Sequence, residues 1–391
     1  MQKRWLLLVV SLLTLSVLKS QNNTPPAPLR IAVFTQLYLD SAFTSERVYK
    51  HDVLMPKYIL PGLDFMEGLL IAADSLRNAG NVEIRIYDTK SDQQKITTLE
   101  KNNLFDSIHL IIGAVSGNEY KLLSDIALAH QIPFLSATFP NEGGVKNNPF
   151  TIILNPTIGV HCNAIVQFIQ QYFFASRLFF LQKKTSQDNR LRTMFIQANQ
   201  NSGLKKSLKW IEHNASDTFK IDDIIPLLDS TRQNLIICAS FDEKLATQCL
   251  NYKSDLKPYD IQFIGLPHWE TLREVNLTKH NNKTIYFPTA FFNDGSSDFE
   301  IFQRIFQEKT LGKASDIAFK GYDATVNFIQ LLIKHQQNFI NQINDAQFQK
   351  MIHYNIQPVL SAQTKQPDYF ENKRIYIIKK TNGLSTKMGK F

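Results

Sequence analysis

The sequence contains little cysteine: Cys162, Cys238 and Cys249 are its only thiols in 391 residues. An odd number without a regular framework excludes a fold built on disulfides. Because free cysteine is among the residues most often buried, we expect three isolated buried thiols. A bridge between Cys238 and Cys249 is the alternative, since an exported compartment would permit it.

Strong charge of one sign is also absent. Lysine and arginine number 43 against 35 acidic residues, and the net charge falls from +8 to +5 without Lys3, Arg4 and Lys19. The remaining excess is scattered along the chain, which argues against nucleic acid as a partner. Apolar residues at 43% and charged ones at 20% are typical of a globular chain.

A second long apolar run is missing as well. The one such run, Trp5–Leu18, follows Lys3 and Arg4 and is too short to span a bilayer comfortably. We interpret residues 1–20 as a cleaved secretory signal and 21–28 as a linker, with a mitochondrial presequence as the alternative. No cysteine lies near the cleavage site to carry a lipid anchor. The prediction is a periplasmic or secreted product that is not embedded in a membrane.

What the sequence does contain is a regular alternation of short apolar runs and longer segments of helical period. Leu29–Phe34 predicts a first strand, and apolar residues recur every three or four positions over 66–76. Val82, Ile84 and Ile86 then alternate with polar residues in a second strand. This pattern is typical of βαβ units, so the predicted class is α/β with a mainly parallel sheet covered on both faces.

The same pattern starts again near Asn155-Pro156. The strands of this second block are expected at 178–181, 235–238 and 261–265. Two successive blocks of similar size predict two doubly wound lobes of the same architecture. A late strand at 284–287 feeds two helices, and a last strand over 374–379 precedes a basic tail, 381–391, that we expect to be frayed.

Several local strings lie in the order and at the separations of one family. The strings are Ile111-Ile112-Gly113-Ala114-Val115-Ser116, Ile132-Pro133-Phe134-Leu135-Ser136-Ala137-Thr138 and Gly321-Tyr322-Asp323-Ala324. From about Leu29 to Lys380 the chain resembles type 1 periplasmic solute-binding proteins of the leucine/isoleucine/valine-binding branch. Leu60-Pro61-Gly62-Leu63-Asp64-Phe65 and Gly265-Leu266-Pro267-His268-Trp269 are similar to a subgroup from bacteria of the Bacteroidetes type.

The resemblance implies two similar parallel-sheet lobes joined by a three-segment hinge. It places residues 29–154 plus 288–340 in lobe 1 and residues 155–287 plus 341–380 in lobe 2. The crossings would fall at Asn155-Pro156, Pro288 and Ile340–Asn344. A ligand would sit between the lobes at the carboxyl ends of strands, a position that the physics of open parallel sheets also favours.

In lobe 1, Ser116 and Asn118 stand between a predicted strand and a helix, where hydroxyl, amide and backbone N–H groups could hold a carboxylate. Helix capping is the competing interpretation. The resemblance implies that Ser136, Ala137 and Thr138 recognise the main-chain end of an amino acid, against an ordinary turn motif.

In lobe 2, several polar and aromatic residues follow predicted strands: Gln182, Lys183, Ser240, Phe241, His268, Trp269 and Glu270. Of these we select Ser240, Trp269 and Glu270 as ligand contacts. The resemblance implies an acidic partner for a ligand ammonium group, which Glu270 or Asp242 could supply. Trp269 could stack on a ligand or fill the core of the lobe.

The sequence lacks the common local motifs of enzymes. Ser116 stands one place too late for a G-x-S-x-G elbow, and no phosphate-binding glycine loop or H-E-x-x-H string occurs. The nine histidines are dispersed, with no metal-ligand spacing. We therefore predict no catalytic residue, no metal site and no cofactor.

These features predict an exported protein that closes a cleft on a small ligand, which an amino acid would fit, for transport through a membrane permease or for sensing. The alternative is a cell-envelope interaction or regulatory protein that keeps the fold with a lost or altered pocket. A hydrolase using Ser116 or Ser136 is a third and weaker hypothesis.

Overall fold

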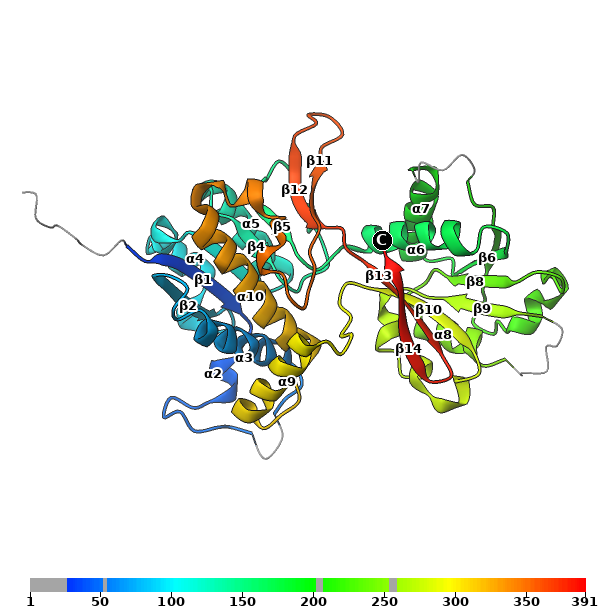
Figure 1. Cartoon of the computed structure of the whole chain (residues 1–391), viewed down its shortest axis with the longest axis horizontal. Helices are drawn as coiled ribbons and strands as arrows, with labels where there is room; N and C mark the ends of the chain where they lie inside the picture. Colours follow the sequence, from blue (N-terminus) through cyan, green and yellow to red (C-terminus); the bar gives the residue numbers. More distant parts are fainter. Residues whose placement is uncertain (1–26, 52–54, 202–206, 253–258) are drawn as a thin grey trace, which may run out of the picture.

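The structure is a computed structural model, and it describes residues 27–51, 55–201, 207–252 and 259–391. The predicted signal at 1–20 and most of the predicted linker lie outside the described residues. Figure 1 shows two lobes side by side, joined by a narrow region of connecting chain. Each lobe contains a seven-stranded sheet with helices packed against it. The predicted fold class is confirmed.

The first sheet has the strand order β11-β12-β5-β4-β3-β1-β2, and all its pairings are parallel except β11 with β12. Its strands are β1 (Leu29–Thr35), β2 (Val82–Asp88), β3 (Leu110–Ala114), β4 (Phe134–Ser136), β5 (Thr151–Ile153), β11 (Ile356–Leu360) and β12 (Pro367–Asn372). The inner strand β3 is buried along its whole length. A sheet covered on both faces explains why its sequence reads as a continuous apolar run.

The second sheet has the order β14-β13-β10-β9-β8-β6-β7. Its strands are β6 (Arg177–Gln182), β7 (Ile211–Asn214), β8 (Asn234–Cys238), β9 (Ile261–Ile264), β10 (Thr284–Thr289), β13 (Tyr376–Thr381) and β14 (Leu384–Lys390). The pairings from β7 to β10 are parallel, and β13 is antiparallel to both β10 and β14. The two sheets thus repeat one architecture.

The helices divide between the lobes. Those of the first lobe are α2 (Leu39–Ala42), α3 (Leu60–Ser75), α4 (Ile96–Lys101), α5 (Gly117–His130), α9 (Ser297–Thr310) and α10 (Asp316–His335), and those of the second are α6 (Ile158–Tyr172), α7 (Ser186–Asn201) and α8 (Glu243–Leu250). Short 3₁₀ helices are η1 (Asp92–Gln94), η2 (Leu104–Ser107), η3 (Ile221–Leu227), η4 (Pro267–Glu270), η5 (Glu274–Asn276), η6 (Thr278–His280), η7 (Gln336–Asn338), η8 (Ile340–Gln342) and η9 (Ala346–Phe348). Within the described part of the chain, none of the helices is long and apolar enough to cross a membrane.

Helices α3 and α10 pack unusually close together, and two glycines make this possible. A Cβ on Gly68 would lie 2.0 Å from the carbonyl oxygen of Ala318, and one on Gly321 would lie 2.3 Å from that of Phe65. The string Gly321-Tyr322-Asp323-Ala324 therefore serves packing. The buried carboxylate of Asp323 accepts hydrogen bonds from the backbone N–H groups of residues 351 and 352, which ties the following loop to α10.

The boundary between the lobes differs from the prediction near the C-terminus. Residues 356–372, predicted in lobe 2, form β11 and β12 of the first sheet, where β12 runs parallel to β5. The third crossing is consequently at 373–375 and not at 340–344. Residues 384–390, predicted as a frayed tail, form β14 on the edge of the second sheet. Local periodicity marks strands but cannot say which sheet they join, and a polar edge strand gives a weak signal.

Three segments connect the lobes, at 154–157, 290–296 and 373–375 (Figure 1). The first leaves the carboxyl end of β5, the second that of β10, and the third joins the carboxyl end of β12 to β13. Because β13 is antiparallel to β10, it begins at the carboxyl end of β10. All three crossings therefore join the carboxyl edges of the two sheets, so these edges face each other.

Candidate ligand-binding cleft

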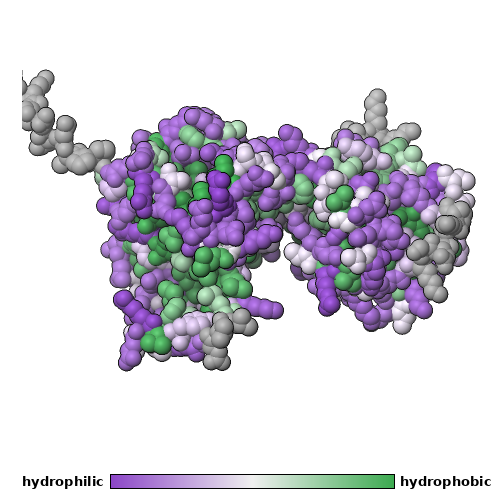
Figure 2. Space-filling model, turned by 60° about the horizontal axis from the view of Figure 1, so that its bottom comes forward, coloured by the Kyte–Doolittle hydropathy of each residue, from purple (hydrophilic) through white to green (hydrophobic). Residues whose placement is uncertain are grey.

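Strand order locates a crevice in each lobe. In the first sheet β1 lies between β2 and β3, and in the second β6 lies between β7 and β8. Chains leaving neighbouring strands at such a switch point turn to opposite faces of the sheet, which leaves a crevice at their carboxyl ends. The two crevices face each other across the space between the lobes. Figure 2 shows this space as a wide notch beneath the neck that joins the lobes.

Asp88 organises the wall that the first lobe contributes. Its buried carboxylate accepts hydrogen bonds from the backbone N–H groups of Leu37, Tyr38, Leu39 and Lys90, at 2.9, 3.2, 2.8 and 3.0 Å. This clamp holds Tyr38 at φ 55°, a left-handed conformation that costs free energy for a residue with a side chain. Because the hydrogen bonds to Asp88 offset this strain, the loop after β1 is held in one defined conformation.

Aromatic and charged side chains gather around that loop. The ring centroid of Tyr38 lies 4.8 Å from that of Tyr58, and Lys90 Nζ lies 5.8 Å from the Tyr38 ring centroid. Glu119 receives the Lys90 ammonium at 2.8 Å and the Gln36 amide at 2.6 Å. Sequence reasoning missed this cluster. Its only signal was position, since Gln36, Tyr38 and Lys90 follow the ends of β1 and β2.

Ser116 and Asn118 lie where the prediction requires, at the carboxyl end of β3 and the start of α5, and both are exposed. Ser116 occupies the N-cap position, yet its side chain makes no capping hydrogen bond. The competing capping role of Ser116 is therefore not realised. Its hydroxyl stands beside the first N–H groups of α5, where the helix dipole favours an anion.

The second predicted group of lobe 1 is less accessible. Ser136 is fully buried, and its hydroxyl has no hydrogen-bond partner among the described residues. Ala137 is buried as well, while Thr138 is half-buried and its carbonyl oxygen accepts a 2.7 Å bond from the side chain of Asn155. Thr138 thus connects the end of β4 with the first crossing.

Two predicted contacts of lobe 2 are structural. The Ser240 hydroxyl is buried and lies 3.1 Å from each carboxylate oxygen of Asp188, which also accepts the backbone N–H of Lys183. Trp269 is fully buried beneath Gly265, where an added Cβ would lie 2.0 Å from the indole ring. Neither side chain reaches the cleft, so both differ from the prediction. Burial against distant parts of the chain could not be read from their positions after strands.

Other residues form the lobe 2 surface at the switch point. Lys183 pairs with Asp242 at 2.6 Å and with Asp217 at 2.8 Å, and these partners raise the pKa of its ammonium group. Asp242 also caps α8, so its carboxylate already has partners in the protein. The rings of Phe241 and His268 lie 5.2 Å apart, and neither ring nitrogen of His268 has a hydrogen-bond partner in the described part of the chain.

Glu270 lies nearer the hinge, where η4 approaches the second crossing. Its carboxylate accepts a 2.8 Å hydrogen bond from the hydroxyl of Thr289. Burial raises the pKa of Glu270 to about 7, the charge of Asp316 adds to the increase, and Lys320 opposes it. Asp316 and Lys320 belong to α10 of the other lobe. The ionisation of Glu270 is therefore linked to the approach of the two lobes.

His161 belongs to the same region through Lys320. Burial lowers the pKa of His161 to about 3, and the positive charge of Lys320 contributes to the decrease. Burial also lowers the pKa of Lys320, against the fields of Asp316 and Glu270. Titratable groups from α6, η4 and α10 thus influence one another where the crossings meet the lobes.

The cysteines lie in the cores of the lobes. All three cysteines are buried free thiols. Cys238 and Cys249 are neighbours rather than isolated: their mutual hydrogen bond and burial raise the pKa of Cys238. Across the described ranges, no group of three or more His, Cys, Asp or Glu side chains is arranged to hold a metal ion.

Comparisons with known proteins show the fold. Neither a protein-family model nor a curated protein matches the sequence. Among solved structures, a Rhodospirillum rubrum protein assigned to branched-chain amino acid ABC transport aligns over 93% of this chain and 100% of its own, with a TM-score of 0.67 and 14% identity. A periplasmic ligand-binding protein of a branched-chain amino acid ABC transporter from Burkholderia xenovorans gives 0.63 and 11%, over 93% and 95%.

A third similar structure is an ABC transporter substrate-binding protein from Desulfitobacterium hafniense in complex with Leu. It has a TM-score of 0.54 and 13% identity, over 93% of this chain and 100% of that one. The chain therefore adopts the two-lobed fold of type 1 periplasmic binding proteins along nearly its whole length. At such identities the likeness extends to architecture, and the chemistry of the cleft is this chain's own.

Proposed function

We propose that this protein is a solute-binding protein that closes its two lobes on a small solute, and that it catalyses no reaction. The observation that carries the proposal is that two switch-point crevices face each other across three chain crossings. A solute that contacts both walls at once would favour the closed arrangement. The ligands of the similar solved structures, Leu in one case, are consistent with this function.

An amino acid or a similar small zwitterion fits the groups at the cleft. Ser116 and the first N–H groups of α5 suit a carboxylate. Glu270 suits an ammonium group, because its carboxylate accepts from the neutral hydroxyl of Thr289 and Lys320 acts on it without a hydrogen bond. An arriving ammonium would lower the raised pKa of Glu270 and favour its ionised form. Tyr38 and Phe241 offer ring surfaces from opposite lobes for the remainder of the solute.

Export to the periplasm and delivery to a membrane permease complete the proposal. The apolar run Trp5–Leu18 behind two basic residues supports export. Transport partners are typical of the similar solved structures, which are named for ABC transporters.

The test is a ligand screen on protein unfolded and refolded to remove co-purified solute. We expect one class of small zwitterion to raise the melting temperature, because a ligand that binds only folded protein stabilises it. Small-angle X-ray scattering should then show a smaller radius of gyration. Glu270→Gln should weaken this ligand at least tenfold, whereas Glu100→Gln, an exposed control on α4, should not.

A second function, an envelope interaction protein with the same fold, is favoured by one observation. The segment between β1 and α3 leaves several large apolar side chains exposed: Leu39, Phe43, Val48, Met55 and Tyr58. Exposed apolar surface of this extent can serve a protein partner. A screen in which no solute shifts the melting temperature, together with a stable envelope partner recovered by pull-down, would favour this function over solute binding.

A further inference from the structure

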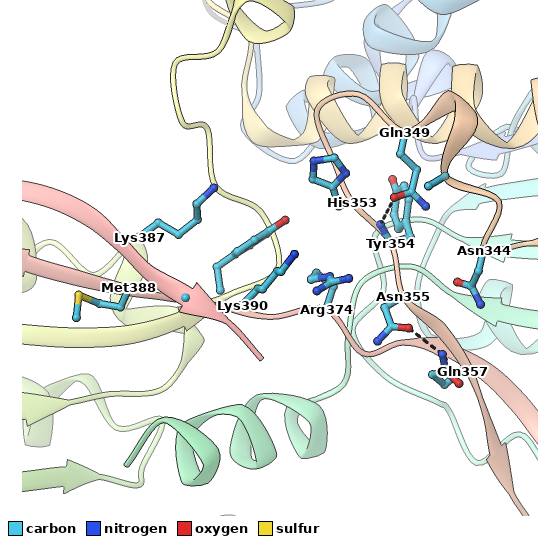
Figure 3. Close-up of a pocket in the computed structure, with 13 residues that line it drawn as sticks. Asn344, Gln349, His353, Tyr354, Asn355, Gln357, Arg374, Lys387, Met388 and Lys390 are labelled. Carbon is cyan, nitrogen blue, oxygen red and sulfur yellow. Dashed lines mark hydrogen bonds between the residues drawn. The ribbon is translucent and has the colours of Figure 1, made fainter. Parts of the chain in front are cut away.

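A second cavity lies beside the hinge, outside the switch-point cleft. Its volume is about 760 Å³, within the range of small-molecule sites. The first lobe lines it with the loop from Asn344 to Gln357, and the second lobe with Arg374, Tyr376 and the end of β14 (Figure 3). The cavity is therefore shared by both lobes, next to the third crossing.

Its lining is basic and contains no carboxylate. Arg374, Lys387 and Lys390 contribute positive charge, and the ring nitrogens of His353 add polar groups. Lys387 has one acidic neighbour, Asp294 at 3.3 Å, which lies outside the lining. Within the described residues, Arg374 and Lys390 have no ion-pair partner, and the Nε of Arg374 is buried without any hydrogen-bond acceptor. Three side-chain cations around a lining without a carboxylate favour an added anion.

The cations of the lining act together on the ring of His353. Partial burial lowers the pKa of His353, and the charges of Arg374, Lys390 and Lys387 lower it further, against a weaker opposing effect of Asp294. Figure 3 shows the side chains of Lys390 and Arg374 extending into the space between the two lobes' segments, with the ring of His353 above them. Amide side chains add neutral donors: Asn344, Gln349, Asn355 and Gln357. The rings of Tyr354 and Tyr376 supply apolar surface.

We propose that this hinge cavity binds a small organic polyanion, with Arg374 and Lys390 as its main charged contacts. Phosphate and carboxylate groups share the required chemistry, since both accept paired hydrogen bonds from a guanidinium group. A volume of about 760 Å³ leaves room for an organic body beside the charged groups. Tyr354 and Tyr376 would contact that body.

The strand order predicts how an anion in this cavity would affect closure of the lobes. The cavity adjoins the edge strands β11 and β14, whereas the crevices at β1/β3 and β6/β8 lie on the other side of the crossings. When the lobes rotate about the crossings to close the crevices, the edge strands must separate. An anion that bridges the lobes at the hinge would therefore oppose closure on a solute. This coupling rests on the proposed function, while binding of the anion does not.

The binding test uses the full-length protein and two probes at constant ionic strength, pyrophosphate and citrate, in isothermal titration calorimetry. We expect one site, with the preferred probe identifying phosphate or carboxylate as the natural group. Lys390→Ala and Arg374→Gln should each weaken that probe at least tenfold. Lys121→Ala, which removes one exposed positive charge from α5, should change the affinity less than twofold.

Absence of binding by both probes would overturn the proposal, as would affinities that Lys390→Ala and Arg374→Gln leave unchanged while both variants melt like the parent protein. The coupling has its own measurement: saturating probe should weaken the cleft solute severalfold in the parent but not in Lys390→Ala. If the probe binds and solute affinity does not change, the site stands and its opposition to closure is refuted. If no solute binds at all, the proposed function fails while the anion site remains.

Discussion

Substitution of Glu270 by glutamine tests the electrostatics of the hinge directly. The pKa of Glu270 is raised from 4.5 to about 7, chiefly by burial. That difference corresponds to about 3 kcal/mol in favour of the protonated carboxyl. Since the folded protein holds this proton more tightly than the unfolded chain, the associated stability is complete below pH 4.5 and is lost as the pH rises through about 7.

Glutamine keeps an oxygen for the hydroxyl of Thr289 and has no charge to lose. Urea denaturation of the parent and of Glu270→Gln between pH 4.5 and 8 should therefore give curves that diverge with pH. We expect similar free energies of unfolding at pH 4.5 and a variant more stable by up to about 3 kcal/mol at pH 8.

Glu100→Gln provides the control, because this exposed glutamate on α4 should leave the pH dependence as it is. The reasoning is refuted if the curves of the parent and Glu270→Gln run parallel from pH 4.5 to 8. It is equally refuted if the variant is the less stable protein at pH 8, since an ionised Glu270 would then be stabilising.

Further predictions concern the clamp, the helix pair and the thiols. Asp88→Ala should cost about 3 kcal/mol in urea denaturation and speed amide exchange at residues 37–39, because four N–H groups lose their acceptor; unchanged exchange would contradict the clamp. Gly321→Ala should cost about 3 kcal/mol because α10 must move away from α3, whereas Gly159→Ala, which meets only a side-chain atom at 3.8 Å, should cost nothing. All three cysteines should react with Ellman's reagent only in denaturant, since each is buried and burial raises the pKa of Cys162 to about 12; rapid reaction of the native protein would contradict their burial.

Much of the fold was predictable because its signals are local. Strand β8 is buried throughout, so the apolar run at 235–238 was visible in the sequence. The α5 start was equally visible as Ser116-Gly117-Asn118 after an apolar strand, and these residues do lie at a switch point. In such places the residues of one short segment are enough to predict both its conformation and its burial.

The ligand-binding residues were harder to predict from the sequence, because the exposure of a side chain depends on partners that are distant in the chain. Ser240 is held by Asp188, 52 residues earlier, and Trp269 lies in a core cluster with Phe179 and Ile236. The important loop at Tyr38 depends on Asp88, 50 residues away. No pattern around these residues distinguishes a ligand contact from a core residue.

The sequence by itself determined the alternation of strands and helices, the two repeated blocks and the first break between them, because periodicity and turn chemistry act over a few residues. Only the tertiary structure decided that β12 pairs with β5, and that cations of lobe 2 meet the amide side chains of lobe 1 at the hinge. Pairing partners, burial and the sum of separate charges depend on contacts between segments that are not adjacent in the chain, and those contacts exist only once the chain is folded.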